Sequence, residues 1–277
     1  MIFDKRIIPI RNDVASSEYK GFLTKRKFVK GKTYYVKKNF SNLFSRDKKN
    51  IISQLLYGEA VTVYEVKNGY AWLQSLRDDY VGYTEACNLQ TKKINPTHKI
   101  IALCSIIYKT PNIKSIPITE LSFNSLVEIT GEIKNKNFYK IKNLGWCHQK
   151  DLTNLKVENL DRVELAKKFL NTPYLWGGRN SMGIDCSGLI QNIFQINNRY
   201  FPRDSDMQEE FITTEIKEKN LKKGDLIFWK GHVAMMIDNR NIIHANAFHM
   251  RTEIEPLRTA KARIKKNYGK IIKIGRD

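Results

Sequence analysis

Long apolar runs are absent from this sequence of 277 residues. No stretch approaches the roughly 20 consecutive apolar residues that a helix needs to cross a bilayer, so a helical membrane span is excluded. The first residues, 1–6, also lack the apolar core of a secretory signal. We therefore expect a cytoplasmic protein, unless its true start lies upstream.

Cysteine is scarce, with only four residues in the chain. Their spacing fits neither a paired zinc motif nor a disulfide framework, and Cys147 beside His148 does not make a metal site by itself. We therefore expect no metal and no cofactor. Because a lone cysteine is most often a small buried hydrophobic residue, we assign that structural role to Cys87, Cys104 and Cys147.

Acidic residues are outnumbered, since 28 Asp and Glu against 48 Lys and Arg give a formal net charge of +20. An excess of this size favours anionic partners. The basic residues are mostly scattered, however, and no stacking aromatics are interleaved with the densest cluster, so we expect no nucleic acid partner. We interpret that cluster as solvated surface. It comprises Arg258, Lys261, Arg263, Lys265, Lys266, Lys270, Lys273 and Arg276.

One stretch combines a chemically reactive side chain with the signals of a helix start. Residues 183–191 are Gly-Ile-Asp-Cys-Ser-Gly-Leu-Ile-Gln, in which a polar, turn-forming beginning leads into helical apolar spacing. The pattern places Cys186 in the first helical turn. Unpaired N–H groups and the positive end of the helix dipole favour a thiolate there, which is the nucleophilic form of cysteine.

Two histidines downstream are candidates for the base that such a thiol needs. His232 opens one short apolar strand and His244 lies in the next, with a hairpin turn expected at 238–241. The two rings share a face only if the loop has an odd length, for example three residues centred near Arg240, or if the hairpin contains a bulge. One histidine would then act as the base and the other would fix its tautomer.

Six motifs in this order carry a family resemblance: Tyr-Leu-Trp-Gly-Gly at 174–178, Asp-Cys-Ser-Gly at 185–188, Pro-Arg-Asp-Ser at 202–205, Gly-Asp-Leu-Ile-Phe at 224–228, His-Val at 232–233 and Ile-His-Ala at 243–245. Residues 158–277 thereby resemble the NlpC family of papain-like cysteine peptidases, which cut bacterial cell-wall peptides. The resemblance implies that Cys186 is the nucleophile, His232 the general base and His244 the residue that orients it. It also implies that Tyr174 helps to stabilise the oxyanion.

The chain divides into three expected domains. Residues 1–92 form an arm, with a strand near 7–10, and a first all-β domain whose short strands resemble a bacterial SH3-like barrel. Residues 93–156 repeat the theme as a second, more divergent barrel. Residues 157–277 form an α+β, papain-like catalytic domain that opens with an amphipathic helix at 157–170 and continues into a mainly antiparallel sheet.

The resemblance also implies a substrate. Family members with this domain order cleave the bond between γ-D-glutamate and a diamino acid, and those lacking a signal peptide commonly act on recycled fragments with a free N-terminal L-alanine. Asp204 and Ser205 match positions that bind this ammonium group, with Asp185 and Ser187 nearby. Alternatively, Asp204 or Ser205 caps a helix over 207–211.

Three further residues complete the predicted substrate-binding set. Tyr80 and Glu59 of the first barrel are candidates for closing the pocket, although Tyr80 could equally be an ordinary barrel aromatic residue. Arg203 would pair with a substrate carboxylate or, alternatively, form a surface salt bridge.

Two other functions remain open. The same thiol chemistry would serve an exported peptidoglycan hydrolase or amidase that acts on polymer. A basic wall-, membrane- or nucleic-acid-binding module with an inactive peptidase core would instead bind polymer in a salt-sensitive manner without turnover. The preferred diamino acid and the oligomeric state stay undetermined.

Overall fold

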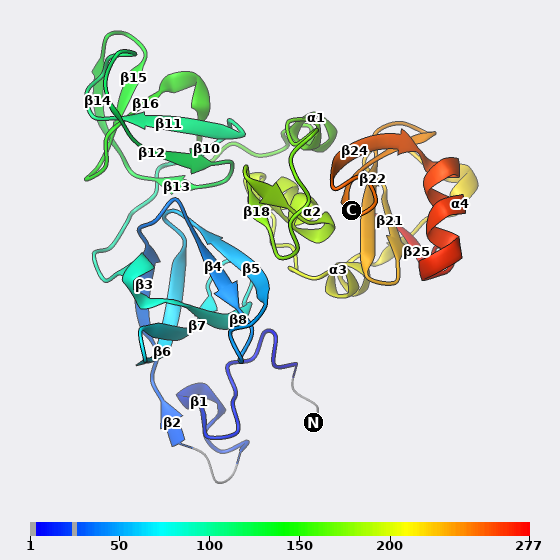
Figure 1. The fold of residues 1–277 in the computed structure, drawn as a ribbon, viewed down its shortest axis with the longest axis horizontal. Coiled ribbons are helices and arrows are strands. Elements are labelled where there is room, and N and C mark those ends of the chain that lie inside the picture. Colours follow the sequence, from blue (N-terminus) through cyan, green and yellow to red (C-terminus); the bar gives the residue numbers. More distant parts are fainter. Residues whose placement is uncertain (1–3, 24–26) are drawn as a thin grey trace. The chain divides into compact units, whose positions relative to one another are not determined.

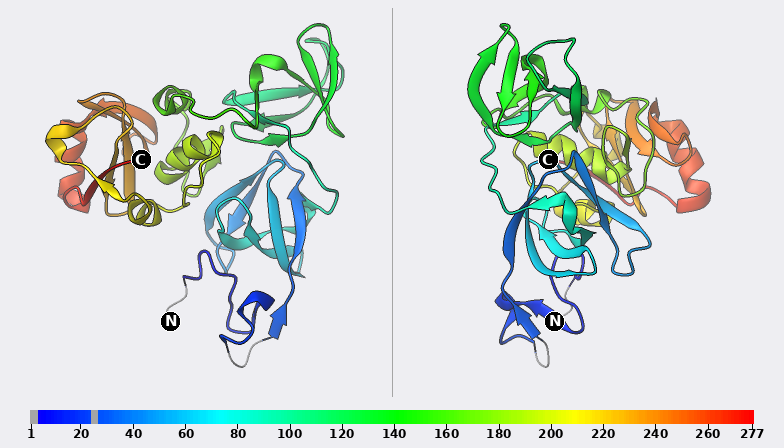
Figure 2. Two further views of the ribbon diagram at one scale, coloured as in Figure 1. Left: turned by 180° about the vertical axis from the view of Figure 1, so that it is seen from behind. Right: turned by 60° about the vertical axis from the view of Figure 1, so that its left-hand side comes forward.

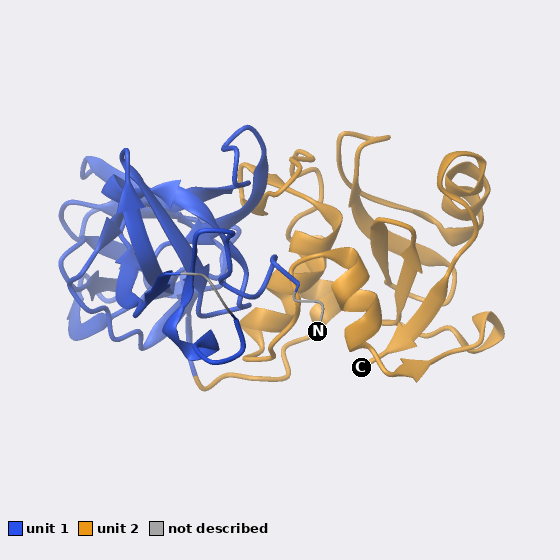
Figure 3. Cartoon of the chain, turned by 90° about the horizontal axis from the view of Figure 1, so that it is seen from below, with its two compact units in different colours: residues 1–155 blue, residues 156–277 orange. Residues whose placement is uncertain are grey.

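The computed structural model describes residues 4–23 and 27–277, which form two compact units at residues 1–155 and 156–277 (Figure 3). The division lies beside the start at 157 that we expected for the catalytic domain. Each unit has its own hydrophobic cores, and each is described here by itself.

The arm of the first unit contains two short parallel strands, β1 (Val14–Ser16) and β2 (Lys27–Val29), and the 3-10 helix η1 (Ser17–Tyr19). The strand expected near residues 7–10 is wrong. The N–H groups of Ile7 and Ile8 both bond to the carbonyl of Asp4 in a turn, and Ile10 forms only an isolated bridge to Ala15. Residues 7–10 therefore do not form a strand, although their apolar pattern predicted one.

The first barrel is a seven-stranded antiparallel sheet in the order β5-β4-β8-β7-β6-β3-β9 (Figure 1). Its hairpin between β6 and β7 turns at Asn68 and Gly69, both with positive φ, as the Asn-Gly signal predicts. The strand β4 was not anticipated. The elements are β3 (Lys32–Val36), β4 (Phe40–Phe44), β5 (Ile51–Leu56), β6 (Ala60–Lys67), β7 (Tyr70–Ser75), β8 (Val81–Glu85), η2 (Ala86–Asn88) and β9 (Leu89–Gln90).

The second barrel is built from a three-stranded sheet, β13-β10-β17, and a five-stranded sheet, β12-β11-β16-β15-β14. Its edge strand β12 was likewise not anticipated. The backbone N–H of Leu126 bonds to the carbonyl of Tyr57, which joins the two barrels within this unit. The elements are β10 (His98–Ile100), β11 (Cys104–Tyr108), β12 (Pro117–Ser122), β13 (Leu126–Val127), β14 (Ile129–Lys134), β15 (Phe138–Ile141), β16 (Trp146–His148), η3 (Gln149–Asp151) and β17 (Leu152–Asn154).

The second unit packs helices on a six-stranded sheet in the order β20-β25-β21-β22-β23-β24, whose pairs are all antiparallel. Helix α2 covers one side of this sheet and α4 the other (Figures 1 and 2). The elements are α1 (Arg162–Lys167), β18 (Arg179–Asn180), β19 (Gly183–Ile184), α2 (Cys186–Ile196), α3 (Ser205–Phe211), β20 (Thr214–Glu215), η4 (Glu218–Asn220), β21 (Leu226–Trp229), β22 (His232–Met236), β23 (Asn241–Asn246), β24 (Arg251–Pro256), α4 (Leu257–Tyr268) and β25 (Lys273–Arg276).

Two expectations about the helices of this unit need correction. Helix α1 begins only after Asp161, whose side chain caps it, so it is shorter than the 157–170 expected. Helix α4 was missed because its basic residues obscure a narrow apolar stripe, Leu257, Ala260 and Ile264, which is buried on the sheet.

The basic cluster at residues 258–276, which we interpreted as solvated surface, also forms ion pairs with the rest of the unit. Lys261 on α4 pairs with Glu218, Arg276 on β25 pairs with Asp225, and Arg263 pairs with Glu255. These ion pairs connect the last helix and strand to the rest of the unit.

The strand alternation of β22 and β23 decides where the two candidate histidines lie. Ala234 and Met236 on β22, with Ile242 on β23, pack in the same core cluster as the apolar stripe of α4. Because side chains alternate between the two faces of a sheet, His232 and His244 lie on this same face.

Candidate active site

The start of α2 is held by Asp185, the residue before the candidate nucleophile. Its Oδ1 accepts the N–H of Gly188 at 2.6 Å and so caps the helix, as the sequence predicts, while its Oδ2 accepts the N–H of Gly177 at 2.8 Å. Gly177 has a φ of +77°, which favours glycine. Gly188 packs so closely on the carbonyl of Gly178 that a Cβ there would lie 2.4 Å from its oxygen. The thiol therefore sits on a tightly built turn.

Arg203 has a different role from either of those predicted for it. It is 1% exposed, and its two terminal nitrogens donate to Asp185 at 3.0 and 2.7 Å and to Ser187 Oγ at 2.9 Å. Arg203 and Asp185 thus form a buried ion pair and not a surface salt bridge. The guanidinium binds the turn that carries Cys186. Asp185 and Ser187 are buried in the same network, and contact of either residue with substrate stays a prediction.

The thiol of Cys186 lies beside the first residues of β22. The backbone N–H of Val233, which follows His232, and the N–H of Ser187 both donate toward the sulfur and favour its anionic form. Tyr174 is half-buried near the same sulfur. Burial, and then the nearby Cys186, raise the pKa of the Tyr174 phenol, so it stays protonated and can donate to an oxyanion.

The hairpin between β22 and β23 brings the two histidines together. Ile237 and Asn241 pair around a loop of three residues, 238–240, which is the odd length that the shared face requires. His232 Nε2 lies 2.8 Å from His244 Nδ1. The loop is centred on Asn239, one residue before the expected centre. In this register both rings lie on one face, and His244 is two residues along its strand from the position directly opposite His232.

Burial opposes the charge of each reacting group taken singly. It raises the pKa of the Cys186 thiol to about 12, with the Asp185 carboxylate acting in the same direction, and it lowers the pKa of His232 well below its usual range. The sequence predicted a resting thiolate. Burial opposes that charge for the thiol taken alone, because a separate charge is costly in this environment. Moving the proton from sulfur to His232 creates both charges together, so each compensates the other.

A carboxylate that the sequence analysis missed lies behind the second histidine. His244 is fully buried, and its Nε2 lies 2.8 Å from Oε1 of Glu255 on β24. Arg263 of α4 holds both carboxylate oxygens, with NH1 at 2.7 Å from Oε2. No local pattern pointed to Glu255, because its partner is supplied by strand pairing and by a helix that was not predicted.

The same histidine belongs to a cluster that could in principle hold a metal ion. Ligand atoms of His244, His249 and Glu255 lie within 4.8 Å of one another. Both ring nitrogens of His244 already have hydrogen-bond partners, and the guanidinium of Arg263 would repel a cation. Hydrogen bonding therefore accounts for this cluster without a metal.

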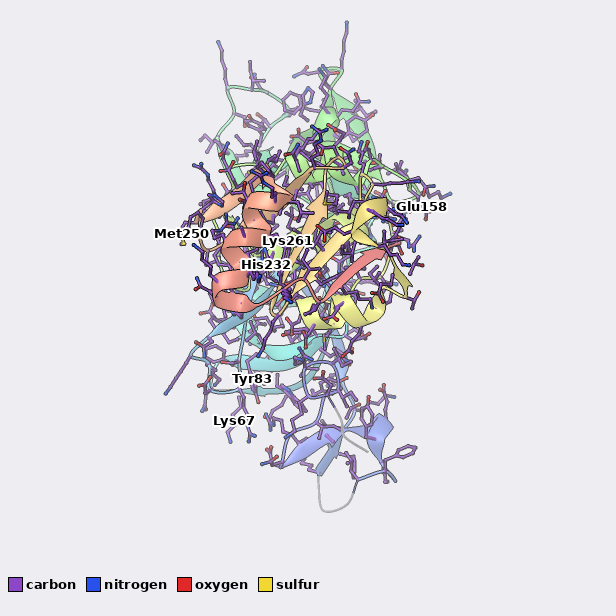
Figure 4. All side chains as sticks on the ribbon, turned by 90° about the vertical axis from the view of Figure 1, so that its right-hand side faces the viewer. Lys67, Tyr83, Glu158, His232, Met250 and Lys261 are labelled. Carbon is purple, nitrogen blue, oxygen red and sulfur yellow. The ribbon has the colours of Figure 1, made fainter. Side chains whose placement is uncertain are left out.

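A pocket of about 430 Å³ opens beside the histidines, between the end of β22 and α4. Figure 4 labels His232 next to this helix. Among the described residues that line the pocket are two basic side chains, Lys230 and Arg263, and no acidic one. Its exposed aromatic residues are Trp176, Phe248 and Tyr268.

The remaining predicted substrate contacts fall in two places. Asp204 and Ser205 lie at the start of α3, where the side chain of Asp204 makes no capping hydrogen bond. Tyr80 and Glu59 belong to the other unit. The ring of Tyr80 is in the core of the first barrel, and buried Glu59 accepts the N–H of Leu56 and pairs with Arg77. Their contact with substrate stays a prediction.

A thiol at a helix start beside the strand that His232 opens, with a second imidazole hydrogen-bonded to the first, is the arrangement of a papain-like cysteine peptidase site. The comparisons with known proteins agree. The chain belongs to the NlpC/P60 family of cysteine peptidases, whose pattern matches residues 171–269, and residues 45–87 match the bacterial dipeptidyl-peptidase SH3 domain.

Three similar proteins illustrate the relationship. Dipeptidyl-peptidase 6 of Lysinibacillus sphaericus is 32% identical over 70% of this chain and 67% of its own length. A gamma-D-glutamyl-L-lysine dipeptidyl-peptidase of Bacillus cereus is 29% identical over 75% of this chain and 71% of its own. A crystal structure of an NlpC/P60 family protein from Bacillus cereus superimposes with a TM-score of 0.74 at 22% identity, covering 88% of this chain and 99% of that one. The predicted α+β catalytic domain after SH3-like β-domains is thus confirmed.

Proposed function

We propose that this peptidase hydrolyses the γ-D-glutamyl–diamino acid bond of wall-derived peptides that carry a free N-terminal L-alanine. The observation that carries the proposal is Cys186 beside the start of β22, where His232 is hydrogen-bonded to His244, in a chain whose relatives include a gamma-D-glutamyl-L-lysine dipeptidyl-peptidase. Cys186 would attack the γ-carbonyl after its proton passes to His232, and His232 would then protonate the leaving amine.

Asp204 supports the part of the proposal that concerns the free amine. Asp204 is the N-cap residue of α3, but its side chain makes no capping hydrogen bond, which supports a role other than capping. A carboxylate at this position would make a charge-assisted contact with the ammonium group of L-alanine, stronger than a neutral hydrogen bond. Ser205, the next residue, would add a hydroxyl acceptor.

The pocket beside His232 suits the leaving diamino acid. Because His232 must protonate the leaving nitrogen, the departing residue lies on the histidine side of the thiol. Trp176 and Tyr268 offer apolar surface there for a straight aliphatic chain, and Lys230 offers a cation for a carboxylate. Both diaminopimelate and a C-terminal lysine carry such a carboxylate on the leaving residue.

In the cell, this activity would belong to the recycling of wall fragments in the cytoplasm. Within the described residues, no helix is long and apolar enough to cross a membrane. Cell fractionation followed by immunoblotting tests the location. Recovery of the native protein outside the cytoplasm would contradict this part of the proposal and favour the polymer-cutting alternative.

The first experiment is mass spectrometry after incubation with L-Ala-γ-D-Glu-diaminopimelate and with the corresponding lysine peptide. We expect release of the dipeptide by the unmodified protein and none by Cys186→Ala, since the covalent step requires the thiol. Cys104→Ala is the matched control and should retain turnover, because Cys104 lies in the other unit. The buried role predicted for Cys87 and Cys104 is wrong, since both are exposed. Normal cleavage by Cys186→Ala would remove the central assignment.

The second experiment is a double cycle of Asp204→Ala against N-acetylation of the substrate, measured as kcat/KM at fixed pH. Each change alone should cost about two to three decades, because each removes one side of the same ionic contact. Together they should cost little more than either alone. Additive losses would show that Asp204 does not contact the amine. Equal cleavage of free and acetylated peptides by the unmodified protein would point to a polymer-cutting hydrolase.

A further inference from the structure

A continuous line of hydrogen bonds runs from the candidate base to the last helix. It passes from His232 Nε2 to His244 Nδ1 at 2.8 Å, from His244 Nε2 to Glu255 Oε1 at 2.8 Å, and from Glu255 to Arg263. The members come from four different elements, β22, β23, β24 and α4. His244 is fully buried and Glu255 is 7% exposed, so water competes little with these bonds.

The proton positions along this line follow from the charge of Glu255. Burial alone would raise the pKa of this carboxyl, but the hydrogen bonds from Arg263 and His244 outweigh it and lower the pKa to about 2. Glu255 is therefore an anion at neutral pH and can only accept. His244 Nε2 must carry a proton to bond with it.

The tautomer of His244 then determines the tautomer of His232. Burial lowers the pKa of His244, against the opposing effect of Glu255, so its ring is neutral and carries one proton. With that proton on Nε2, its Nδ1 is an acceptor, and His232 Nε2 must donate to it. Nδ1 of His232 is left as the one ring nitrogen that can take a proton from Cys186.

We propose that Glu255 and Arg263 are positioning residues that fix the tautomers of both catalytic histidines. The proposal rests on His232 being the base of the proposed reaction. Arg263 has only hydrogen-bond donors, so it holds the acceptor oxygens of Glu255 toward itself. It therefore keeps Glu255 in place as the acceptor for His244 Nε2–H. It also offsets the charge of Glu255, since Glu255 raises and Arg263 lowers the pKa of His232. The carboxylate therefore orients the base without making it permanently charged.

The test begins with Glu255→Gln, which preserves shape but replaces one oxygen by an NH₂ donor. Arg263 donates to both carboxylate oxygens, so the NH₂ opposes one guanidinium nitrogen in either orientation of the amide; where it faces His244, both tautomers reverse and His232 Nδ1 carries the proton. We expect kcat to fall by up to about 10⁴-fold, the loss that a wrong-tautomer substitution causes in the serine protease triad, with little change in KM. Nitrogen NMR of histidine-labelled protein should show His232 changing from the Nε2–H to the Nδ1–H form.

A double variant separates positioning from packing. In Glu255→Gln/Arg263→Met the amide is no longer held by a guanidinium and can turn its oxygen to His244, so both tautomers and much of kcat should return. Glu253→Gln is the matched control, since Glu253 is the direct cross-strand neighbour of His244 on β24 but pairs with Arg251.

Two results would overturn the proposal. One is a folded Glu255→Gln protein with unchanged kcat and unchanged histidine nitrogen spectra. The other is a double variant with no recovery of the original tautomers. If Glu255→Gln does not fold, the test uses the histidine spectra of two other proteins, the double variant and Arg263→Met. Both should keep the original tautomers, and a changed tautomer in either would contradict the proposal. The spectra do not depend on turnover, so failure here is distinguishable from failure of the proposed function.

Discussion

At the residue scale, the environment of the thiol and the imidazole governs how the site responds to pH. His232 is faced by His244 from β23 and by Arg263 from α4, and both lower its pKa in addition to burial, while Glu255 opposes them. Cys186 is faced by Asp185, which raises its pKa, and by Arg203, which lowers it. Burial and these neighbours therefore disfavour a charge on either group taken alone.

This leads to a prediction for the pH profile. A base with a lowered pKa stays unprotonated as pH falls, so kcat/KM should persist through pH 6.5, the usual value for histidine, and decline only below it. On the alkaline side, the raised pKa of Cys186 should prevent a change in protonation near its usual value of 9.0. The measurement is kcat/KM from about pH 4 to about pH 10. An acid limb centred at or above 6.5 would contradict it.

At the scale of elements, the start of α2 depends on a single carboxylate. Asp185 caps the helix, accepts the N–H of Gly177 and neutralises buried Arg203. Removing one partner of a buried ion pair leaves the other charge uncompensated, which costs far more than the pair itself contributes. The position of the thiol therefore depends on the contacts of this carboxylate within the turn.

We predict that Asp185→Ala lowers the free energy of unfolding by about 3–5 kcal/mol, because Arg203 is left buried without its anion. Thermal and denaturant unfolding measure the change. Lys167→Ala, which breaks the exposed i,i+3 pair with Glu164, is the control and should have little effect. A loss for Asp185→Ala no larger than for this control would show that the network contributes little to stability.

At the scale of the whole molecule, the catalytic chemistry is confined to one of two compact units. Cys186, His232, His244 and the pocket beside them all lie within residues 156–277, which also have their own core. The unit at residues 1–155 carries the predicted contacts Tyr80 and Glu59. The two units therefore allow folding and substrate recognition to be tested separately.

We predict that a protein consisting of residues 156–277 folds on its own, as measured by circular dichroism and cooperative unfolding. If Tyr80 and Glu59 contact substrate, its KM should rise by at least about tenfold, which corresponds to about 1.4 kcal/mol, relative to the full chain. An unchanged KM would remove both residues from the substrate site. Failure to fold would contradict the independence of the unit.

The sequence by itself determined the class of fold, and it singled out Cys186, His232 and His244 as the candidate site residues. These features are local, because a helix start, a hairpin turn and a strand period are encoded by neighbouring residues such as those around Cys186 and 238–241. The pattern failed where context overrides it. Residues 7–10 are apolar but form a turn, and the stripe of α4 is too narrow to stand out among its basic residues.

Only the tertiary structure decided how the charged groups are partnered. Arg203 looked like a surface or substrate-binding residue, yet folding buries it against Asp185. Glu255 and Arg263 had no signal at all, because they meet His244 only when β24 pairs with β23 and α4 packs on the sheet. Burial then set the direction of each pKa, including that of Cys186. The cost of an isolated charge depends on what surrounds it in three dimensions, and that surrounding is not written in any short stretch of sequence.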